Sequence, residues 1–148
     1  MRARMKLVSK SVADTRAFAE KIFKSLTPGA SARVLALYGD LGSGKTTFVQ
    51  SLGKFLGVTH SMQSPTFVLM KRYELNHSSF KNFIHIDAYR LEKPDELARL
   101  DFERFLSDPA NIIAVEWAER VETLLPQDTT RIYFKFVDET TREIEMLE

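Results

Sequence analysis

The sequence contains no cysteine among its 148 residues. This absence excludes disulfide scaffolds, thiolate zinc sites and cysteine nucleophiles, and it suits a protein of the reducing cytosol. A strong charge of one sign is also missing, because 21 lysines and arginines stand against 20 acidic residues. A chain so close to neutral has no large basic field, so nucleic acid is not expected to be its main direct ligand.

Long hydrophobic runs are absent as well. No apolar stretch approaches the roughly 20 residues that a membrane-spanning helix needs. The first ten residues, MRARMKLVSK, are basic but lack the apolar core of a secretory signal. We therefore expect a cytoplasmic protein with no membrane partner. The length fits one domain over residues 1–148, large enough to bury a core without disulfides or structural metal.

The sequence does contain short apolar strands that alternate with amphipathic helices. Buried strands in such alternation predict an α/β domain with a mostly parallel central sheet, flanked by helices. Ser11 is expected to cap the first helix, with Asp14 completing a variant of the capping box. The expected strands are 5–9, 33–38, 66–75, 82–87, 111–116, 131–137 and 143–147, and the expected helical segments are 12–26, 45–56, 94–106 and 119–124. The last two strands are predicted to form an antiparallel hairpin.

Residues 39–46 read GDLGSGKT and match the phosphate-binding pattern G-x-x-x-x-G-K-[ST]. Glycines let the backbone wrap tightly with its N–H groups facing phosphate oxygens, and the helix that follows adds its positive N-terminal end. Lys45 is expected to reach the outer phosphates and to act in catalysis, and the Thr46 hydroxyl to bind Mg²⁺. The nucleotide contacts expected from this segment are Asp40, Leu41, Gly42, Ser43, Gly44, Lys45, Thr46 and Thr47. A plain glycine turn is the alternative, but the position between an apolar strand and an amphipathic helix favours phosphate binding.

Two carboxylates end apolar strands, Asp87 after FIHI and Glu116 after IIAV. Ligands of parallel sheets bind at the carboxyl ends of the strands, so both residues are candidates for the Mg²⁺ side of the site. Glu116 could in addition orient or deprotonate the attacking water. Asp87 could instead start a turn, Glu116 could pair with an arginine or lysine, and the pattern does not decide which lies nearer the metal. His85 alternates with core residues and is expected to be structural.

Two further residues are candidates for nucleotide contacts. Thr66 lies where the loop containing Ser64 and Pro65 meets a predicted strand, and it could sense the γ-phosphate and Mg²⁺, as switch loops do. A plain turn is the alternative for that loop. Trp117, the only tryptophan, follows Glu116 and could cover the nucleotide or a partner, although a half-buried core position is commoner for this residue type.

These segments occur together in an order that resembles the bacterial TsaE (YjeE-type) ATPase family. The segments are GDLGSGKTTFVQSLGKFLG, SPTFVLMKRYE, HIDAYRL and EWAERV followed by LLP, and the resemblance extends from about Ser11 to Arg142. It implies a P-loop NTPase fold and slow, Mg²⁺-dependent ATP hydrolysis. It also implies a role in threonylcarbamoyladenosine modification of tRNA, with tRNA met through a complex with the TsaB and TsaD proteins.

The resemblance also implies roles for individual residues. Lys45 and Thr46 would hold phosphate and Mg²⁺, and Asp87 would serve Mg²⁺. Thr66 would lie in a switch-like loop. Glu116 and Trp117 would flank the nucleotide, with Glu116 important for hydrolysis. Many members have proline after the Glu-Trp pair, whereas Ala118 stands here, so this turn is expected to be looser or more helical.

A small-molecule P-loop kinase is the main alternative, because a fold and a P-loop alone do not fix the chemistry. Kinases of this kind usually close an arginine-bearing lid over the phosphates, and no arginine-rich lid segment stands out here. A nucleotide-binding switch with scarcely any turnover is the second alternative. No N-K-x-D or L-S-G-G-Q segment occurs, which disfavours a GTPase and an ABC-type ATPase.

Overall fold

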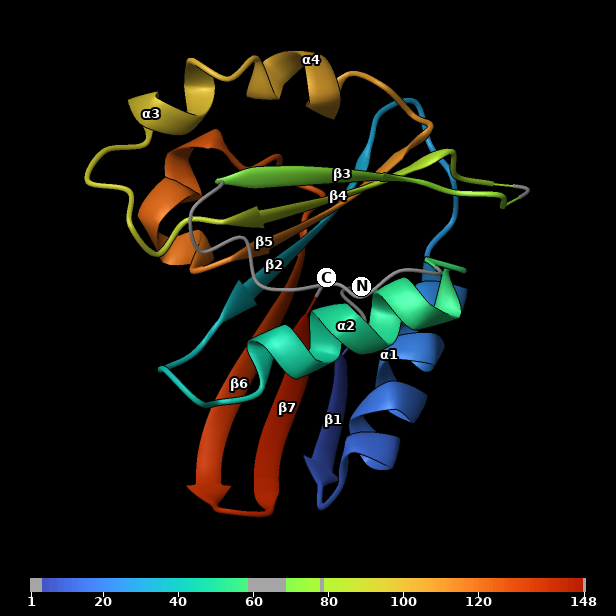
Figure 1. The fold of residues 1–148 in the computed structure, drawn as a ribbon, viewed down its shortest axis with the longest axis vertical. Coiled ribbons are helices and arrows are strands. Elements are labelled where there is room, and N and C mark those ends of the chain that lie inside the picture. Colours follow the sequence, from blue (N-terminus) through green and yellow to red (C-terminus); the bar gives the residue numbers. More distant parts are fainter. Residues whose placement is uncertain (1–3, 59–68, 78, 148) are drawn as a thin grey trace.

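The computed structural model describes residues 4–58, 69–77 and 79–147 of the chain (Figure 1). The strands are β1 (Arg4–Ser9), β2 (Arg33–Tyr38), β3 (Met70–Glu74), β4 (Asn82–Asp87), β5 (Asn111–Glu116), β6 (Thr130–Asp138) and β7 (Thr141–Leu147). The helices are α1 (Val12–Ser25), α2 (Lys45–Phe55), α3 (Asp95–Ala98), α4 (Phe102–Leu106) and the 3₁₀ segment η1 (Ala118–Leu124). None of the helices in these ranges is long and apolar enough to cross a membrane.

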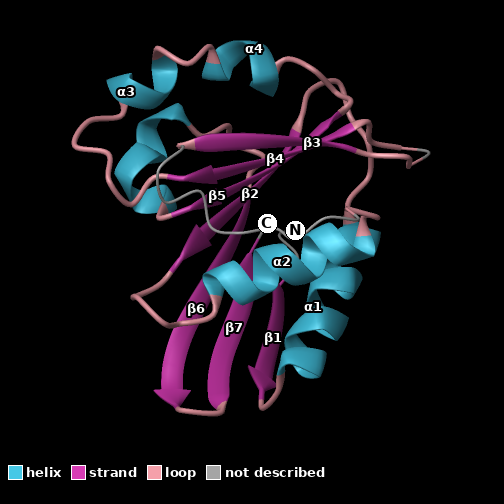
Figure 2. Ribbon diagram, viewed as in Figure 1, coloured by secondary structure: helices cyan, strands magenta, loops and turns pink. Residues whose placement is uncertain are grey.

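All seven strands form one sheet in the order β1-β7-β6-β2-β5-β4-β3 (Figure 2). The four central strands β6, β2, β5 and β4 run parallel to one another. The remaining pairs are antiparallel, with β6–β7 and β7–β1 on one side and β4–β3 on the other. The predicted α/β class, the parallel centre and the C-terminal hairpin are thus confirmed. The order also places the carboxyl ends of β2, β5 and β4 side by side, which sets up the site described below.

Helices cover the two faces of the sheet at different places. The α1 and α2 helices pack together on one face, where Ile22, Phe48 and Leu52 are fully buried. The opposite face is covered by α3, α4 and η1, which bury Leu97, Phe102 and Val121. Figure 1 shows α2 crossing in front of the sheet and α3 and α4 beyond its β3 edge. Burial of these apolar side chains on both faces is the main source of the fold's stability.

The start of α1 follows the prediction from its sequence. The Ser11 side chain accepts a hydrogen bond from the Asp14 N–H at 3.1 Å, and Asp14 Oδ2 accepts one from the Lys10 N–H at 2.9 Å. One backbone donor that the helix leaves unpaired, the Asp14 N–H, is thereby satisfied, together with the Lys10 N–H just before the cap. This reciprocal cap fixes where β1 ends and α1 begins, a junction that also borders the cavity of the candidate site.

The helix predicted over 94–106 is wrong as a single element, because α3 and α4 are separate. Asp101 lies between them with a left-handed backbone, φ 64°. A continuous helix that buries Leu97 would turn Leu100 and Arg104 toward the core, whereas the break lets Phe102 be buried and leaves Leu100 41% exposed. Burial of the larger aromatic ring outweighs the loss of helical hydrogen bonds. The strand predicted over 66–75 is seen as β3 from Met70, and residues 66–68 lie outside the described part.

Candidate functional site

The glycine-rich loop joins β2 to α2, as its sequence predicts. Gly39, Gly42 and Gly44 all have positive φ, and Gly44 is the residue that precedes α2. A Cβ added to Gly39 would lie 2.6 Å from the backbone oxygen of Phe134, so a side chain cannot fit there. Gly44, at the N-cap, has no side chain with which to cap the first turn of α2. The N–H groups and the positive end of this helix are therefore available to an anion.

Lys45 is held inside the loop by its own neighbours. Its Nζ donates to the backbone oxygens of Gly39 and Asp40, the latter at 3.0 Å, and lies 4.0 Å from the ring centroid of Trp117. Only 5% of the residue is exposed. Burial lowers the pKa of Lys45 below its usual value, while nearby carboxylates, Glu116 foremost, act in the opposite direction. Within the described ranges, the hydrogen bonds of this ammonium group go to neutral acceptors, and exchanging them for charged phosphate oxygens would give stronger hydrogen bonds.

Glu116 lies beside the loop because β5 pairs directly with β2. Its Oε1 accepts a hydrogen bond from the Thr46 hydroxyl at 2.9 Å, and its Oε2 lies 2.5 Å from His85 Nε2. Glu116 is 2% exposed and His85 1% exposed. The partner of Glu116 is thus a histidine rather than the arginine or lysine considered from the sequence. The predicted strand-end carboxylate is therefore brought into direct contact with the predicted Mg²⁺-binding threonine.

Asp87 ends β4 beside Glu116, and the two residues are paired in the parallel ladder. Asp87 Oδ1 accepts a hydrogen bond from the Tyr89 N–H at 3.0 Å, so Asp87 does start a turn. It also lines the same cavity as Lys45 and Glu116. The two interpretations of Asp87 made from the sequence are therefore compatible, since the side chain that holds the turn also lines the cavity.

Trp117 adopts a left-handed backbone conformation, φ 57° and ψ 45°, which is uncommon for a bulky residue. Its ring lies 5.0 Å from that of Tyr89 and extends over Lys45. Ala118 begins η1, which agrees with the expectation of a more helical turn at this position. The Tyr38 hydroxyl ties η1 to the end of β2 through a 2.5 Å hydrogen bond with Glu122. The strained residue is thus held between two anchored segments.

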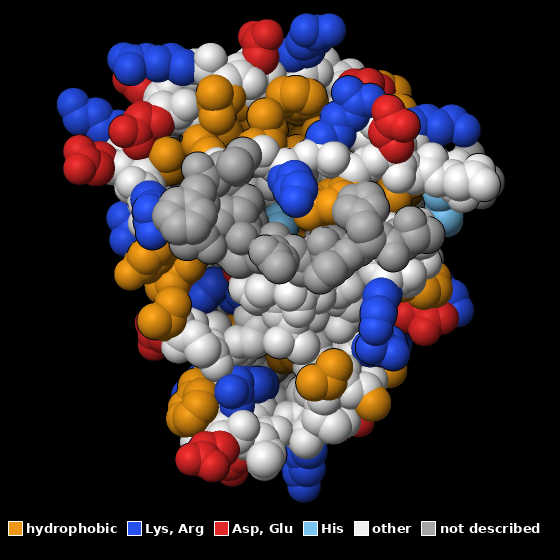
Figure 3. Space-filling view, viewed as in Figure 1, with side chains coloured by type: hydrophobic (Ala, Val, Ile, Leu, Met, Phe, Trp, Pro, Cys, Tyr) orange, Lys and Arg blue, Asp and Glu red, His pale blue; other side chains and the backbone are white. Residues whose placement is uncertain are grey.

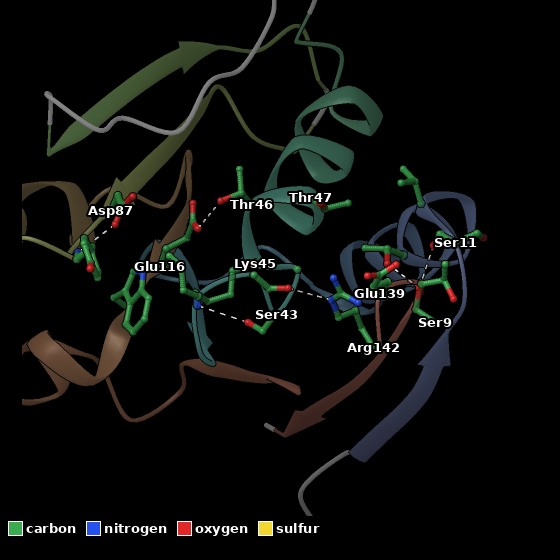
Figure 4. Close-up of a pocket in the computed structure, with 18 of the residues that line it drawn as sticks. Ser9, Ser11, Ser43, Lys45, Thr46, Thr47, Asp87, Glu116, Glu139 and Arg142 are labelled. Carbon is green, nitrogen blue, oxygen red and sulfur yellow. Dashed lines mark hydrogen bonds between the residues drawn. The ribbon is translucent and has the colours of Figure 1, made fainter. Parts of the chain in front are cut away.

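A cavity of about 620 Å³ runs along the mouth of the loop (Figure 4). Asp87 and Glu116 lie at one end, and Ser9, Ser11, Glu139 and Arg142 lie at the other. The predicted contacts Leu41, Gly42, Ser43, Gly44, Lys45, Thr46, Thr47 and Trp117 all line it. Asp40 contributes its backbone oxygen to Lys45 and is not part of the wall, and Thr66 lies outside the described residues.

The second end of the cavity was missed by sequence reasoning. It is formed by the β1–α1 junction, residues 9–12, and by the turn between β6 and β7, residues 139–142. Arg142 Nε donates to the Gly42 oxygen at 3.0 Å and so attaches that turn to the phosphate-binding loop. No local motif marks these segments, because they meet only through the pairing of β1 with β7.

The oxygen atoms at the end of the cavity formed by Asp87 and Glu116 suit a divalent cation that takes most of its ligands from water and from a bound molecule. In the described part of the chain, no group of three or more histidine, cysteine, aspartate or glutamate side chains could form a complete metal cage. A hydroxyl from Thr46 with the carboxylates of Glu116 and Asp87 is instead what Mg²⁺ uses when water and substrate phosphates supply the remaining oxygens. The residues therefore fit Mg²⁺ bound together with a phosphorylated ligand.

Comparison with known proteins agrees with the resemblance seen in the sequence. The family described as "Threonylcarbamoyl adenosine biosynthesis protein TsaE" matches residues 9–144. The tRNA threonylcarbamoyladenosine biosynthesis protein TsaE of Bacillus subtilis (strain 168) is 37% identical over 131 residues, which cover 88% of this chain and 77% of that protein. The protein of the same description from Aquifex aeolicus (strain VF5) is 40% identical over 116 residues, which cover 77% of each chain.

The fold is similar to a solved structure as well. The crystal structure of Bacillus subtilis YdiB superposes with a TM-score of 0.75 at 28% sequence identity, covering 99% of this chain and 86% of that one. The match therefore includes the P-loop, the central sheet and the C-terminal hairpin together. On the family match and on the identity to its members, the chain belongs to the TsaE family.

Proposed function

We propose that this protein binds ATP with Mg²⁺, hydrolyses it slowly, and assists threonylcarbamoyladenosine modification of tRNA in a complex with TsaB and TsaD proteins. The observation that carries the nucleotide part is the hydrogen bond from Thr46 to Glu116 at the mouth of the glycine loop. It joins a phosphate-binding element to an acidic strand end, which is the pairing that P-loop enzymes use to hold Mg²⁺ and phosphate. The role in tRNA modification rests on membership of the TsaE family.

The shape of the cavity supports a nucleotide. Its volume of about 620 Å³ falls in the ordinary range for small-molecule sites. Phosphates would lie against Gly42 to Thr47, where backbone N–H groups and Lys45 converge. The base and ribose would then extend toward Val12 and Arg142 at the far end, which offers both apolar and polar surface. Adenine preference comes from the family and from the missing guanine motif.

Each site residue has a definite task in this proposal. Lys45 would exchange the oxygens of Gly39 and Asp40 for phosphate oxygens as ATP binds. The Thr46 hydroxyl would go on donating its hydrogen bond to Glu116 and would offer its oxygen lone pairs to Mg²⁺. Mg²⁺, when bound with ATP, would neutralise charge that develops on the phosphate oxygens. Each carboxylate oxygen of Glu116 has more than one lone pair, so Glu116 could keep its hydrogen bonds and still orient or deprotonate the attacking water.

The face of the protein drawn in Figure 3 favours contact with tRNA through partner proteins rather than directly. Figure 3 shows lysine and arginine side chains interspersed with aspartate and glutamate on this face. A mixed surface of this kind gives little of the phosphate affinity that a direct tRNA-binding patch would need. TsaB and TsaD would therefore bring the tRNA, and the state of the bound nucleotide would act through contacts with them.

The proposal is tested by measuring ATP hydrolysis with Mg²⁺, first for the protein alone and then with purified TsaB, TsaD and tRNA. Slow phosphate release alone, with a change in rate and repeated rounds of tRNA modification in the mixture, is the expected result. The Lys45→Met variant serves as the control, because it should release no phosphate in either setting. Rapid phosphate transfer to a metabolite, with indifference to TsaB and TsaD, would favour a small-molecule kinase instead.

A further inference from the structure

His85 has a more specific task than filling the core. We propose that it is a positioning residue, which fixes the Glu116 carboxylate so that one oxygen faces Thr46. The effect of His85 on hydrolysis depends on the nucleotide site proposed above. The orientation of Glu116 by His85 depends only on the geometry of the two side chains.

The contact between His85 and Glu116 joins neighbouring strands of the sheet. His85 is paired with Ala114 in the parallel ladder, so Glu116, two residues further along β5, projects from the same face of the sheet. His85 Nε2 lies 2.5 Å from Glu116 Oε2, while Oε1 of the same carboxylate accepts the Thr46 hydroxyl at 2.9 Å. The carboxylate is thus held from both sides, by β4 through the histidine and by α2 through the threonine.

A purely structural role would not require an imidazole at this position. On the face of the sheet that carries His85, the nearby strand residues Phe83 and Ala114 are apolar and buried, whereas Ile84 and Ile86 project from the other face. His85 Nδ1 is buried as well and has no hydrogen-bond partner among the residues that the structure describes. Burying an imidazole in apolar surroundings costs free energy that a leucine would avoid. The polar contact that compensates this cost is the one with Glu116, which indicates where the histidine acts.

The direction of the hydrogen bond follows from the donors and acceptors present. An ionised carboxylate only accepts hydrogen bonds. His85 therefore takes the tautomer with its proton on Nε2, and this N–H donates a hydrogen bond to Glu116 Oε2. The terminal torsion of a glutamate side chain is broad and has no strong intrinsic preference. Among the residues that the structure describes, the other hydrogen bond to the Glu116 carboxylate comes from the Thr46 hydroxyl, which by itself would hold only one of the two oxygens. His85 therefore restricts rotation of the Glu116 carboxylate to the orientation in which Oε1 accepts the hydrogen bond of the predicted Mg²⁺-binding residue Thr46.

The first test uses the nucleotide-free protein, so that it does not depend on ATPase activity. Thr46→Val is made in wild type, in His85→Leu and in Phe83→Leu, and the midpoint of thermal unfolding is measured for each. Phe83 is the matched control, because it is buried two residues earlier on β4 and packs against Tyr73. If His85 orients Glu116, the decrease in the unfolding midpoint caused by Thr46→Val is at most half as large in the His85→Leu background as in wild type. In the Phe83→Leu background this decrease is unchanged. Equal losses in all three backgrounds would overturn the proposal.

The second test measures the Mg²⁺ concentration that gives half-maximal ATP hydrolysis. Residues that orient a metal ligand commonly change metal affinity or activity by about 10–100-fold when removed, and we expect an increase of that order in His85→Leu. His85→Gln places an amide donor near the position of Nε2 and should stay within about threefold of wild type. ADP binding in EDTA should change little in either variant, because it depends on the loop and Lys45.

The outcomes separate this inference from the proposed function. Equal impairment of His85→Leu and Phe83→Leu, without rescue by His85→Gln, would reduce His85 to a core residue. A wild-type protein that neither binds nor hydrolyses ATP would refute the proposed function, while the unfolding experiment still decides the role of His85. Should His85→Leu not fold, His85→Asn takes its place, since its amide is too short to reach Glu116.

Discussion

Replacement of Glu116 by glutamine removes the charge of this side chain while keeping its volume. The amide oxygen can still accept the Thr46 hydroxyl, which now lies 2.9 Å from Oε1. On the other side, an amide nitrogen or a neutral oxygen replaces the carboxylate that faces His85 Nε2. Hydrogen bonds to charged groups contribute about 1.5–3 kcal/mol and neutral ones about 1 kcal/mol, so the free energy of unfolding should fall by about 0.5–2 kcal/mol. For a chain of this size, each kcal/mol lowers the Tm by roughly 2–4 °C.

The effect of Glu116→Gln on hydrolysis should be much larger than its effect on stability. Orientation or deprotonation of the attacking water by a general base is worth about 10²–10⁴-fold in rate, and we expect turnover to fall by that order. ATP affinity measured by calorimetry should stay within about threefold, because the loop backbone and Lys45 are untouched. Glu119→Gln is the matched control, since Glu119 is an exposed carboxylate on η1. Turnover of Glu116→Gln within threefold of wild type, in a folded protein that binds ATP, would refute the assignment of Glu116.

Three further predictions follow from contacts of the same site and of the fold. Because burial lowers the pKa of Lys45, the folded protein binds this proton less tightly than the unfolded chain, and stability due to Lys45 rises with pH between the lowered pKa and 10.5. Lys45→Met should therefore raise the Tm of the nucleotide-free protein by an amount that shrinks as the pH approaches 10.5, and should lower hydrolysis by roughly 10²-fold or more. Arg142→Ala removes the donor to the Gly42 oxygen and should weaken ATP binding by about tenfold in calorimetry, whereas unchanged affinity would exclude a role for this contact. Asp101→Gly should stabilise the protein by about 0.5–1 kcal/mol in denaturant unfolding, since glycine tolerates the φ of 64° and the position is exposed; a loss of stability would show that the left-handed backbone at Asp101 carries no strain for glycine to relieve.

The parts of the site that are encoded locally could be predicted from the sequence. The loop from Gly39 to Thr46 carries its conformation in its own glycines, and the Ser11 cap needs only residues within one helical turn. Asp87 and Glu116 could be placed at one edge because parallel strands end together. The same reasoning could not order the strands, so it did not reveal which carboxylate touches Thr46.

Contacts between distant segments account for what the sequence did not reveal. The partner of Glu116 is His85, 31 residues away on the next strand, and an alternating pattern treats such a histidine as one more core position. The far wall of the cavity depends on β1 meeting β7 across nearly the whole chain. The break at Asp101 arose because burial of Phe102 competed with helical continuity, a choice that local periodicity does not decide.

The pairing of β1 with β7 has a consequence for how the protein is made. Arg4 is hydrogen-bonded to Glu145, 141 residues later, so β1 leaves the ribosome long before β7 and cannot pair with it until β7 has been made. The residues that follow β1 form one wall of the cavity, and the turn before β7 forms part of the same wall. The phosphate-binding loop is synthesised early in the chain, yet this wall is absent until β7 has been synthesised. Nascent or truncated chains that lack β7 should therefore hold nucleotide poorly, which would delay high-affinity binding until synthesis has passed residue 147.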